Sequence, residues 1–388
     1  MRRANFVGKT AVTVAFLAFS LAISSVVAQQ PAPPAGAPPG GPARTYKNVQ
    51  VLKDLPFAQM NPTMHLITGQ LGVGCTYCHI WEQWERDDKA RKHIARSMFA
   101  MTAAINKTYF GGAQVVNCYT CHQGHAKPTN MVALPVEPPP HWEAPEPTPP
   151  VLPALDDVLT GYVTALGGEA ALRKITSRVI TGKQNIPTGP AGLIPMPAEV
   201  EIYQKAPNKT IRIARAEKIT VSDGFDGTGA WVQTAAGAVN PLPEPDQSRA
   251  RRQANFYEPL EWKQNYLRMQ VAGIEKVGTR DAFVVVGYPE GDNEERLFFD
   301  TQTKLLLRRK VYISTGMGPS PYQVDFEDYR TVSGVKMPFV ITMNPSTQRN
   351  ELGTSSTITI TKIETNVGID DARFVRPQPR QPAPPRGE

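Results

Sequence analysis

NPTMHLITGQLGVGCTYCH, the sequence of residues 61–79, ends in the first of two similar pentapeptides, and CYTCH at residues 118–122 is the second. Both have the form Cys-x-x-Cys-His, the attachment signature of a c-type haem. Two thiols at this spacing add to the two vinyl groups of one porphyrin, and the histidine that follows binds the iron as its proximal ligand. The pattern predicts two covalently bound c-type haems.

The two motifs contain all four cysteines of the chain. The predicted attachment and proximal-ligand residues are Cys75, Cys78 and His79 for the first haem and Cys118, Cys121 and His122 for the second. Zinc and disulfide bonds are the alternatives. A four-cysteine zinc site leaves roughly 15–20 residues between its pairs, and residues 80–117 form a segment about twice that length. Zinc also gives no reason for a histidine directly after each pair.

The N-terminus has the pattern of an export signal. Arg2, Arg3 and Lys9 supply positive charge, and residues 11–28 are apolar and uncharged. We expect residues 1–28 to be a signal peptide that is removed. The apolar run is longer than usual, so an uncleaved N-terminal anchor is the alternative. Either outcome predicts a periplasmic protein, on the side of the membrane where c-type haems are attached.

The overall charge gives no reason to expect a nucleic-acid partner. The formal net charge is +7, and without the three basic residues of the signal 39 basic and 35 acidic residues remain, a net charge of +4. The four propionates of two haems would nearly cancel this charge. The basic isoelectric point therefore does not indicate binding to nucleic acid or to an anionic membrane surface.

Proline-rich stretches predict the domain boundaries. Residues 29–44 have the composition of a Pro/Gly-rich tether, residues 131–152 that of a semi-rigid linker, and residues 377–388 that of a Pro-rich tail. Between them we expect a small α-helical unit with both haems, at residues 45–130, and a larger domain at residues 153–376.

Two helices are expected in the haem unit. Asn61 followed by Pro62 is typical of a helix start, and Gly72 of a helix end. A second helix is expected from Asp87 and Asp88, which suit the positive end of the helix dipole, to about residue 109. Its apolar stripe, at spacings of four, three and four residues, is Ile94, Met98, Met101 and Ile105.

The first helix offers a distal ligand for the first haem. Met64 lies eleven residues before the first cysteine, where a methionine one helix upstream can reach the iron face opposite the proximal histidine. Met60 and His65 are the rival candidates: Met60 precedes the expected cap, and His65 points about 100° away from Met64. A helical methionine more often packs in a core, but the neighbouring haem favours Met64 as ligand.

The haem unit resembles a known family over about residues 46–130. The segments that carry the resemblance are residues 62–65 (PTMH), 71–75 (LGVGC), 100–106 (AMTAAIN) and 121–124 (CHQG). They are similar to the tetrahaem cytochrome c subunit of photosynthetic reaction centres, an electron donor. In that family each site is typically a helix with an axial methionine, a turn, and Cys-x-x-Cys-His. The resemblance implies electron transfer by covalent haems, in photosynthesis or in another periplasmic electron chain.

Only two of the four sites of that family are present. In the family the last haem can take its sixth ligand from the half that is absent here, so this ligand is open in our chain. Met101 falls where the family's helix also carries methionine, which makes it our first choice for the second haem. Met98 is the second choice and His93 the third. A ligand from a partner chain or an open coordination site are the alternatives.

The larger domain has the pattern of an antiparallel β structure. Period-two runs predict strands at 198–203, 211–213, 282–286, 296–299, 304–312, 322–329, 339–343 and 356–363. Helices are expected over 156–166, over 169–172 and over about 246–270. Around ten antiparallel strands with one or two helices predict a large curved sheet or half-barrel.

This domain resembles the periplasmic lipoprotein-carrier (LolA-like) superfamily over about residues 153–370. The segments that carry the resemblance are 166–168 (LGG), 225–227 (FDG) with Trp231, and 325–330 (DFEDYR) before 334–338 (GVKMP). In that superfamily a half-barrel wraps an apolar cavity that helices cap. The resemblance implies an apolar ligand or lipid. A protein-docking role, and a ligand that the sequence does not reveal, are the alternatives.

The leading functional hypothesis is an exported dihaem electron carrier rather than an enzyme. Ligation by histidine and methionine fills both axial positions and leaves the iron to exchange electrons. Its partners would be redox proteins that the sequence does not name. A dihaem peroxidase-like enzyme or a haem sensor with one open site is the first alternative, although only 43 residues separate the two motifs. A lipid or lipoprotein carrier with accessory haems is the second.

Overall fold

The computed structural model describes residues 46–55, 57–128, 151–188, 194–217, 219–234, 237–244, 246–345 and 355–378. The predicted signal peptide and tether lie outside the described residues, as do most of the predicted linker and tail. No helix in the described part of the chain is long and apolar enough to cross a membrane.

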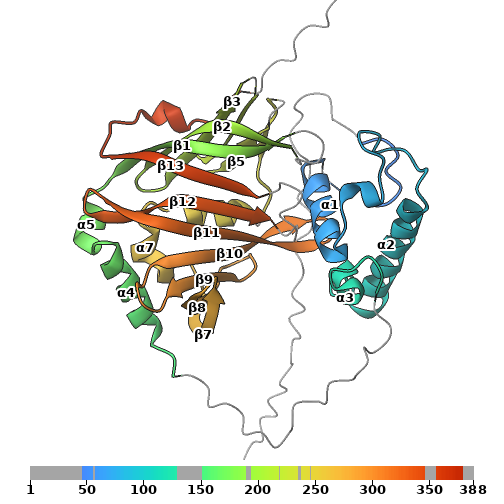
Figure 1. Cartoon of the computed structure of the whole chain (residues 1–388), viewed down its shortest axis with the longest axis horizontal. Coiled ribbons are helices and arrows are strands. Elements are labelled where there is room, and N and C mark those ends of the chain that lie inside the picture. Colours follow the sequence, from blue (N-terminus) through green and yellow to red (C-terminus); the bar gives the residue numbers. More distant parts are fainter. Residues whose placement is uncertain are drawn as a thin grey trace, which may run out of the picture. The chain divides into compact units, whose positions relative to one another are not determined.

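The segment with the two motifs is helical, in the predicted order of helix, attachment motif, helix, attachment motif (Figure 1). Its elements are α1 (Phe57–Leu71), the 3-10 turn η1 (Cys75–Tyr77), α2 (Ala90–Tyr109) and α3 (Cys118–His122). Both motifs therefore form helical turns, η1 around the first and α3 around the second.

Helix α1 begins earlier than the sequence predicted. It starts at Phe57, so Pro62 lies inside the helix and Met60 does not precede it. A proline in a helix removes one backbone hydrogen bond, but Met60 and Leu66 are both buried, at 8% and 4% exposure. Apolar packing on both sides of the proline thus keeps the helix continuous. The predicted end is confirmed: Gly72 has a φ of +61° directly after the last helical residue.

Helix α2 begins later than predicted. Its first residue is Ala90 and Lys89 occupies the N-cap position, so Asp87 and Asp88 lie before the helix. The Asp87 carboxylate instead pairs with Lys92 and Arg96 on the first two turns of α2, and these charge-assisted bonds hold it outside the helix.

The larger part of the chain is an antiparallel sheet, as predicted (Figure 1). Its strands among the described residues are β1 (Ser177–Thr188), β2 (Ile194–Lys205), β3 (Lys209–Ala216), β4 (Ile219–Phe225), β5 (Ala230–Gln233), β6 (Val239–Pro241), β7 (Arg268–Val277), β8 (Arg280–Tyr288), β9 (Glu295–Asp300), β10 (Leu306–Thr315), β11 (Gly318–Val332), β12 (Val335–Pro345) and β13 (Ser356–Thr365). Their order in the sheet is β6-β5-β4-β3-β2-β1-β13-β12-β11-β10-β9-β8-β7.

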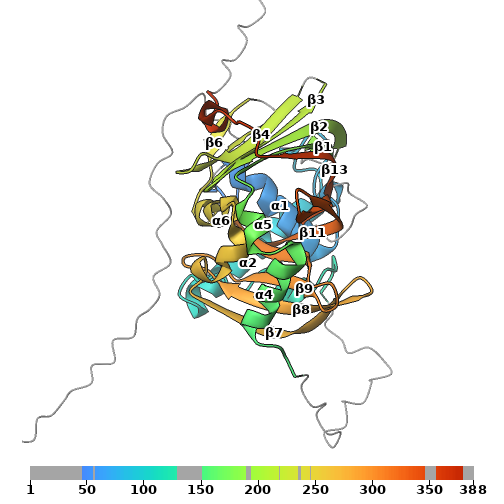
Figure 2. The ribbon, with the colours of Figure 1, turned by 90° about the vertical axis from the view of Figure 1, so that its left-hand side faces the viewer.

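The first and last strands meet in the middle of this sheet. β1 pairs with β13, with Ile180 opposite Ile363, and every other pair joins strands that are neighbours in sequence. The two edge strands, β6 and β7, are also consecutive, and α6 (Asp246–Ala254) and α7 (Glu258–Glu261) connect them. Figure 2 shows α6, with α4 (Leu155–Leu166) and α5 (Glu169–Arg173), between the two ends of the curved sheet.

The described residues contain thirteen strands where about ten were predicted. The predicted strands all fall within or overlap observed ones, but β1 and β4 to β7 were missed. β5 and β6 are only four and three residues long, too short for a periodic pattern. The predicted end of the helical stretch over 246–270 was wrong, because β7 begins at Arg268.

One face of the sheet packs on the helices. Tyr162 of α4 lies edge-on to Phe299 of β9, with ring centroids 5.1 Å apart, and Trp262 after α7 joins the same core. Charges also occur there: the Arg309 guanidinium pairs with Glu258 at 2.7 Å. The interior beneath the helices therefore combines apolar packing with paired charges.

Candidate haem-attachment site

The first motif turns directly after α1. The N–H of His79 donates to the carbonyl of Cys75 at 3.0 Å, and that of Cys78 donates to the same oxygen at 3.3 Å. A helical turn places residues i and i+3 on one side, so both cysteines face the same way. No disulfide joins any of the four cysteines. Burial raises the pKa of the Cys75 and Cys78 thiols.

The second motif is held by two asparagines. Asn117 caps α3: its side-chain oxygen accepts from the N–H of Thr120, and the Thr120 hydroxyl accepts from the N–H of Asn117. Asn106 on α2 is 3% exposed and bonds both backbone groups of Val116, at 2.7 and 2.8 Å. The Asn106 bonds hold the chain just before Cys118 against α2.

Both histidines predicted as proximal ligands are oriented in the same way. His79 Nδ1 lies 3.0 Å from the carbonyl oxygen of Trp84, and His122 Nδ1 lies 3.0 Å from that of His125. A carbonyl can only accept, so each ring carries its proton on Nδ1 and presents the lone pair of Nε2. This is the arrangement that a metal-bound histidine needs. The donor set therefore fits two c-type haems.

The loop after the second motif packs against the end of α1. The N–H of Gly124 donates to the carbonyl of Gln70 at 3.0 Å. A Cβ added at Gly72 would lie 1.9 Å from the Gly124 oxygen. The two attachment motifs, 43 residues apart in sequence, are thus joined at a glycine–glycine contact.

The structure separates the candidates for the distal ligand of the first haem. Met60 is buried among protein side chains, whereas Met64 is half-buried on α1 and so retains exposed surface. His65 is also half-buried, and it makes other interactions in the structure. Met64 stays the predicted ligand.

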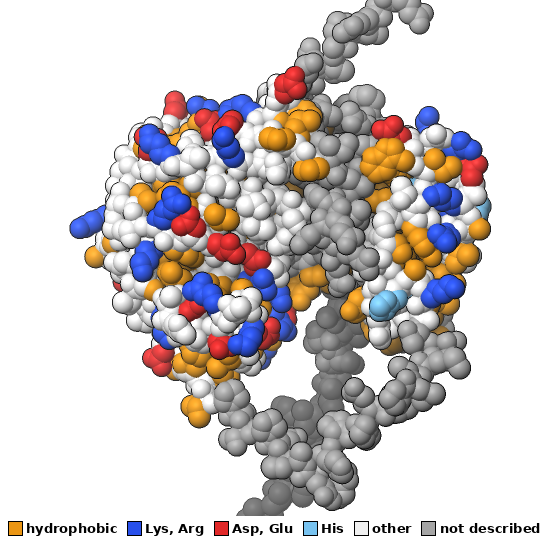
Figure 3. Space-filling model, in the orientation of Figure 1, with side chains coloured by type: hydrophobic (Ala, Val, Ile, Leu, Met, Phe, Trp, Pro, Cys, Tyr) orange, Lys and Arg blue, Asp and Glu red, His pale blue; other side chains and the backbone are white. Residues whose placement is uncertain are grey.

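Three of the four residues of the apolar stripe of α2 are exposed and Ile105 is half-buried. Figure 3 shows hydrophobic side chains on the surface of the helical segment. Ile94, Met98 and Met101 are 57%, 37% and 42% exposed, while Thr102 and Asn106 on the inner face are buried. An apolar face beside Cys-x-x-Cys-His turns suits contact with a porphyrin. Either methionine can serve there, and Met101 stays our prediction. His93 is exposed, and its Nε2 lies 2.8 Å from the carbonyl of Asp87.

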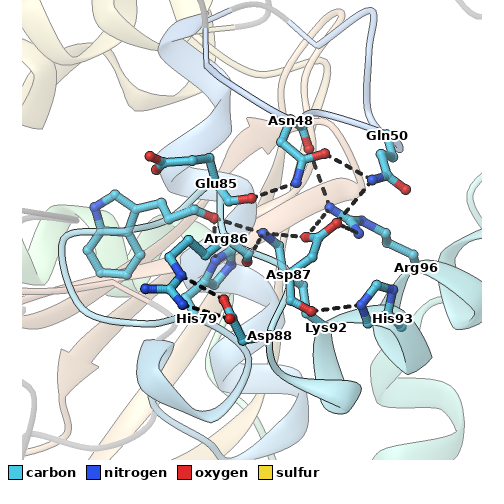
Figure 4. A network of polar contacts seen from close by, with 11 residues as sticks. Asn48, Gln50, His79, Glu85, Arg86, Asp87, Asp88, Lys92, His93 and Arg96 are labelled. Atoms are coloured by element: carbon cyan, nitrogen blue, oxygen red, sulfur yellow. Dashed lines mark hydrogen bonds and ion pairs between the residues drawn. The ribbon is translucent and has the colours of Figure 1, made fainter.

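A polar network that the sequence did not reveal lies between the first motif and α2 (Figure 4). Asp87 accepts two bonds from Arg96, at 2.8 and 2.9 Å, and pairs with Lys92 at 3.0 Å. Lys92 is 8% exposed and also donates to the carbonyls of Trp84 and Arg86. Hydrogen bonds, first from Arg96 and then from Asn48 and Lys92, hold the pKa of Asp87 far below its usual range. The available signal was Lys92 and Arg96 four residues apart, one helical turn.

The comparisons with known proteins agree with this geometry. Residues 10–145 match the model of the family "Photosynthetic reaction centre cytochrome C subunit". The resemblance of the haem-attachment segment to this family is confirmed. A cytochrome c family implies covalently attached c-type haem. Among the described residues no three His, Cys, Asp or Glu side chains are grouped as ligands of a metal ion.

Two reaction-centre cytochromes illustrate the match. The photosynthetic reaction center cytochrome c subunit of Thermochromatium tepidum is 38% identical over 90 residues, 22% of this chain and 22% of that protein. That of Roseobacter denitrificans is 40% identical over 96 residues, 22% of this chain and 26% of that protein. The chain thus spans about a quarter of the length of these relatives.

Solved structures similar to this chain correspond in extent to the β domain. A DUF1329 family protein from Desulfovibrio piger is 14% identical with a TM-score of 0.40, over 57% of this chain and 97% of that one. A LolA superfamily protein from Nitrosomonas europaea is 13% identical with a TM-score of 0.36, over 54% of this chain and 97% of that one. At these scores the likeness carries no information about ligand or activity.

Proposed function

We propose that the chain is an exported dihaem c-type cytochrome that relays electrons between periplasmic or membrane-bound redox partners. The proposal rests on one observation above all: both motifs form helical turns whose histidines have Nδ1 tied to a backbone carbonyl. The family match over residues 10–145 supports it. The iron of a bound haem supplies one-electron exchange.

The residues of this chain would each have a defined role. Cys75 and Cys78 anchor one porphyrin edge, and the cysteines of the second motif anchor the other haem. The carbonyls of Trp84 and His125 hold the two histidines in the ligating tautomer. Met64 would occupy the sixth position of the first haem and Met101 that of the second, which excludes small ligands from both irons.

For the β domain we propose a docking role. A cleft of about 470 Å³ opens on strands β1 to β3 and β13, and its lining includes Lys183, Glu199, Arg215 and Glu217. These four charged side chains fit a polar partner surface. An apolar ligand or lipid is the alternative that the LolA-like resemblance implies.

Haem stoichiometry tests the proposal. The full chain, produced in a periplasm with haem-attachment machinery, should lose its signal segment and gain two haems by mass spectrometry and pyridine haemochrome assay. Cys75→Ser with Cys78→Ser should remove one haem and leave the other. A chain that carries zinc or no haem would overturn the proposal. Ready binding of carbon monoxide at one iron would favour the peroxidase-like or sensor alternative.

A further inference from the structure

We infer that Lys92 is a positioning residue that raises the reduction potential of the first haem. The inference rests on the proposed haem attachment. It concerns a side chain that belongs to neither motif and that reaches the proximal histidine through a shared backbone oxygen.

The contact that carries the inference is at the Trp84 carbonyl (Figure 4). This oxygen accepts from His79 Nδ1 at 3.0 Å and from Lys92 Nζ at 2.8 Å. Lys92 is held there by two further bonds, to the carbonyl of Arg86 at 2.7 Å and to the carboxylate of Asp87 at 3.0 Å. The side chain is buried, so the ammonium is fixed and little screened by water.

Two effects of this ammonium act in the same direction. It draws electron density from the carbonyl oxygen, so the oxygen accepts less strongly from His79 and the imidazole becomes a weaker donor to iron. Its charge also disfavours the extra positive charge of oxidised iron. Both effects favour the reduced haem and raise its potential.

The neighbouring charges do not cancel the effect. Asp87 is shared between Lys92 and Arg96, so the triad keeps one net positive charge. Lys89, which donates to the carbonyl of Thr76 inside the first motif, adds another. Arg86 is paired with Asp88 at 2.7 Å and contributes little net charge.

At the second motif, among the described residues, no basic side chain takes the place that Lys92 has at the first. His122 Nδ1 lies against the carbonyl of His125, and in the described part of the chain no lysine or arginine donates to that oxygen. His125 is exposed, so charges near its carbonyl are screened by water. The two proximal histidines are thus oriented alike, but only the carbonyl that accepts from His79 also accepts from a lysine among the described residues.

Spectroelectrochemical titration of the full, doubly haem-loaded chain tests the inference. In Lys92→Met the reduction equilibrium constant of one haem should fall about tenfold, which is about 59 mV for one electron, and the other should stay unchanged. Lys92→Arg keeps the charge and should restore most of the loss. Lys107→Met, at an exposed position in the last turn of the same helix, is the matched control and should change neither haem.

A second variant keeps the test decisive if Lys92→Met does not fold. Asp87→Asn removes the negative charge of the triad and should shift the same haem in the opposite direction, to a higher potential. Two bound haems with unchanged or equally shifted potentials in these variants would overturn the inference and leave the proposed function intact. Absence of haem in the wild type would overturn the proposed function itself.

Discussion

Substitution of Gly72 by alanine gives a sharp test of the contact that joins the two haem motifs. Gly72 has a φ of +61°, and the Cβ of an alanine would lie 1.9 Å from the oxygen of Gly124 and 2.9 Å from its carbonyl carbon. Gly111 offers a matched control in the same unit: its φ is also +61°, and an added Cβ there meets no atom within 4 Å. The difference between the two variants isolates the contact.

The magnitude follows from the geometry. Both variants place alanine in a left-handed conformation, which costs about 1–2 kcal/mol. In Gly72→Ala the loop at Gly124 must also move by about 1 Å or more to reach normal contact distance. This overpacking costs about 1–3 kcal/mol, and loss of the bond from Gly124 to Gln70 adds about 1 kcal/mol. We therefore expect Gly72→Ala to be less stable than Gly111→Ala by about 2–4 kcal/mol.

The assay is urea unfolding of the full haem-loaded chain, followed by circular dichroism in the Soret band, which reports on the haem unit and not on the β domain. With a slope of about 1 kcal/mol per molar urea for a unit of this size, the midpoint of Gly72→Ala should lie about 2 M or more below that of Gly111→Ala. Equal midpoints would refute the packing of α1 against the second attachment loop.

Other substitutions test the predicted distal ligands, the hydrogen bonds of Asn106 and the ion pairs of Asp87. Met64→Ala should abolish the weak red absorption band of one oxidised haem and lower its potential, and Met101→Ala should do the same for the other haem, whereas Met98→Ala should spare both. Asn106→Ala removes two hydrogen bonds from a buried position and should lower the unfolding free energy of the haem unit by about 2 kcal/mol, measured by the same urea assay. The pKa of Asp87 is lowered in the folded chain. Its contribution to stability is therefore present above its usual pKa near 3.8 and is lost as pH falls through the lowered value. Acid titration followed by circular dichroism in the Soret band should show this loss in the wild type and not in Asp87→Asn.

The local features of the haem unit were predictable because covalent chemistry and helical periodicity fix them. Cys-x-x-Cys-His is a spacing requirement of the porphyrin, so the motif is visible without any tertiary information. The end of α1 was predictable at Gly72, which adopts positive φ without strain. The start of α1 was not, because the burial of Met60 outweighs the helix-breaking tendency of Pro62.

In the β domain, too, some elements were predictable from the sequence and others were not. Period-two runs predicted eight of the thirteen strands and the antiparallel class, because each buried apolar face leaves its alternation in the sequence. They missed β1, whose buried positions include Gly182 and Gln184, and β7, in which no residue is buried. The pairing of β1 with β13 and the short edge strands were decided by contacts between distant segments. Strands of three or four residues have too few positions to show a period.

By itself the sequence predicts which residues attach haem and which histidines ligate it, since these roles depend on the spacing of neighbours in the chain. Only the tertiary structure decided what surrounds them. The carbonyl of Trp84 receives both His79 and Lys92 because α2 folds back onto the first motif. Gly72 meets Gly124 because the second motif returns to the end of α1. Such contacts depend on the three-dimensional path of the chain, and no local pattern of residues specifies them.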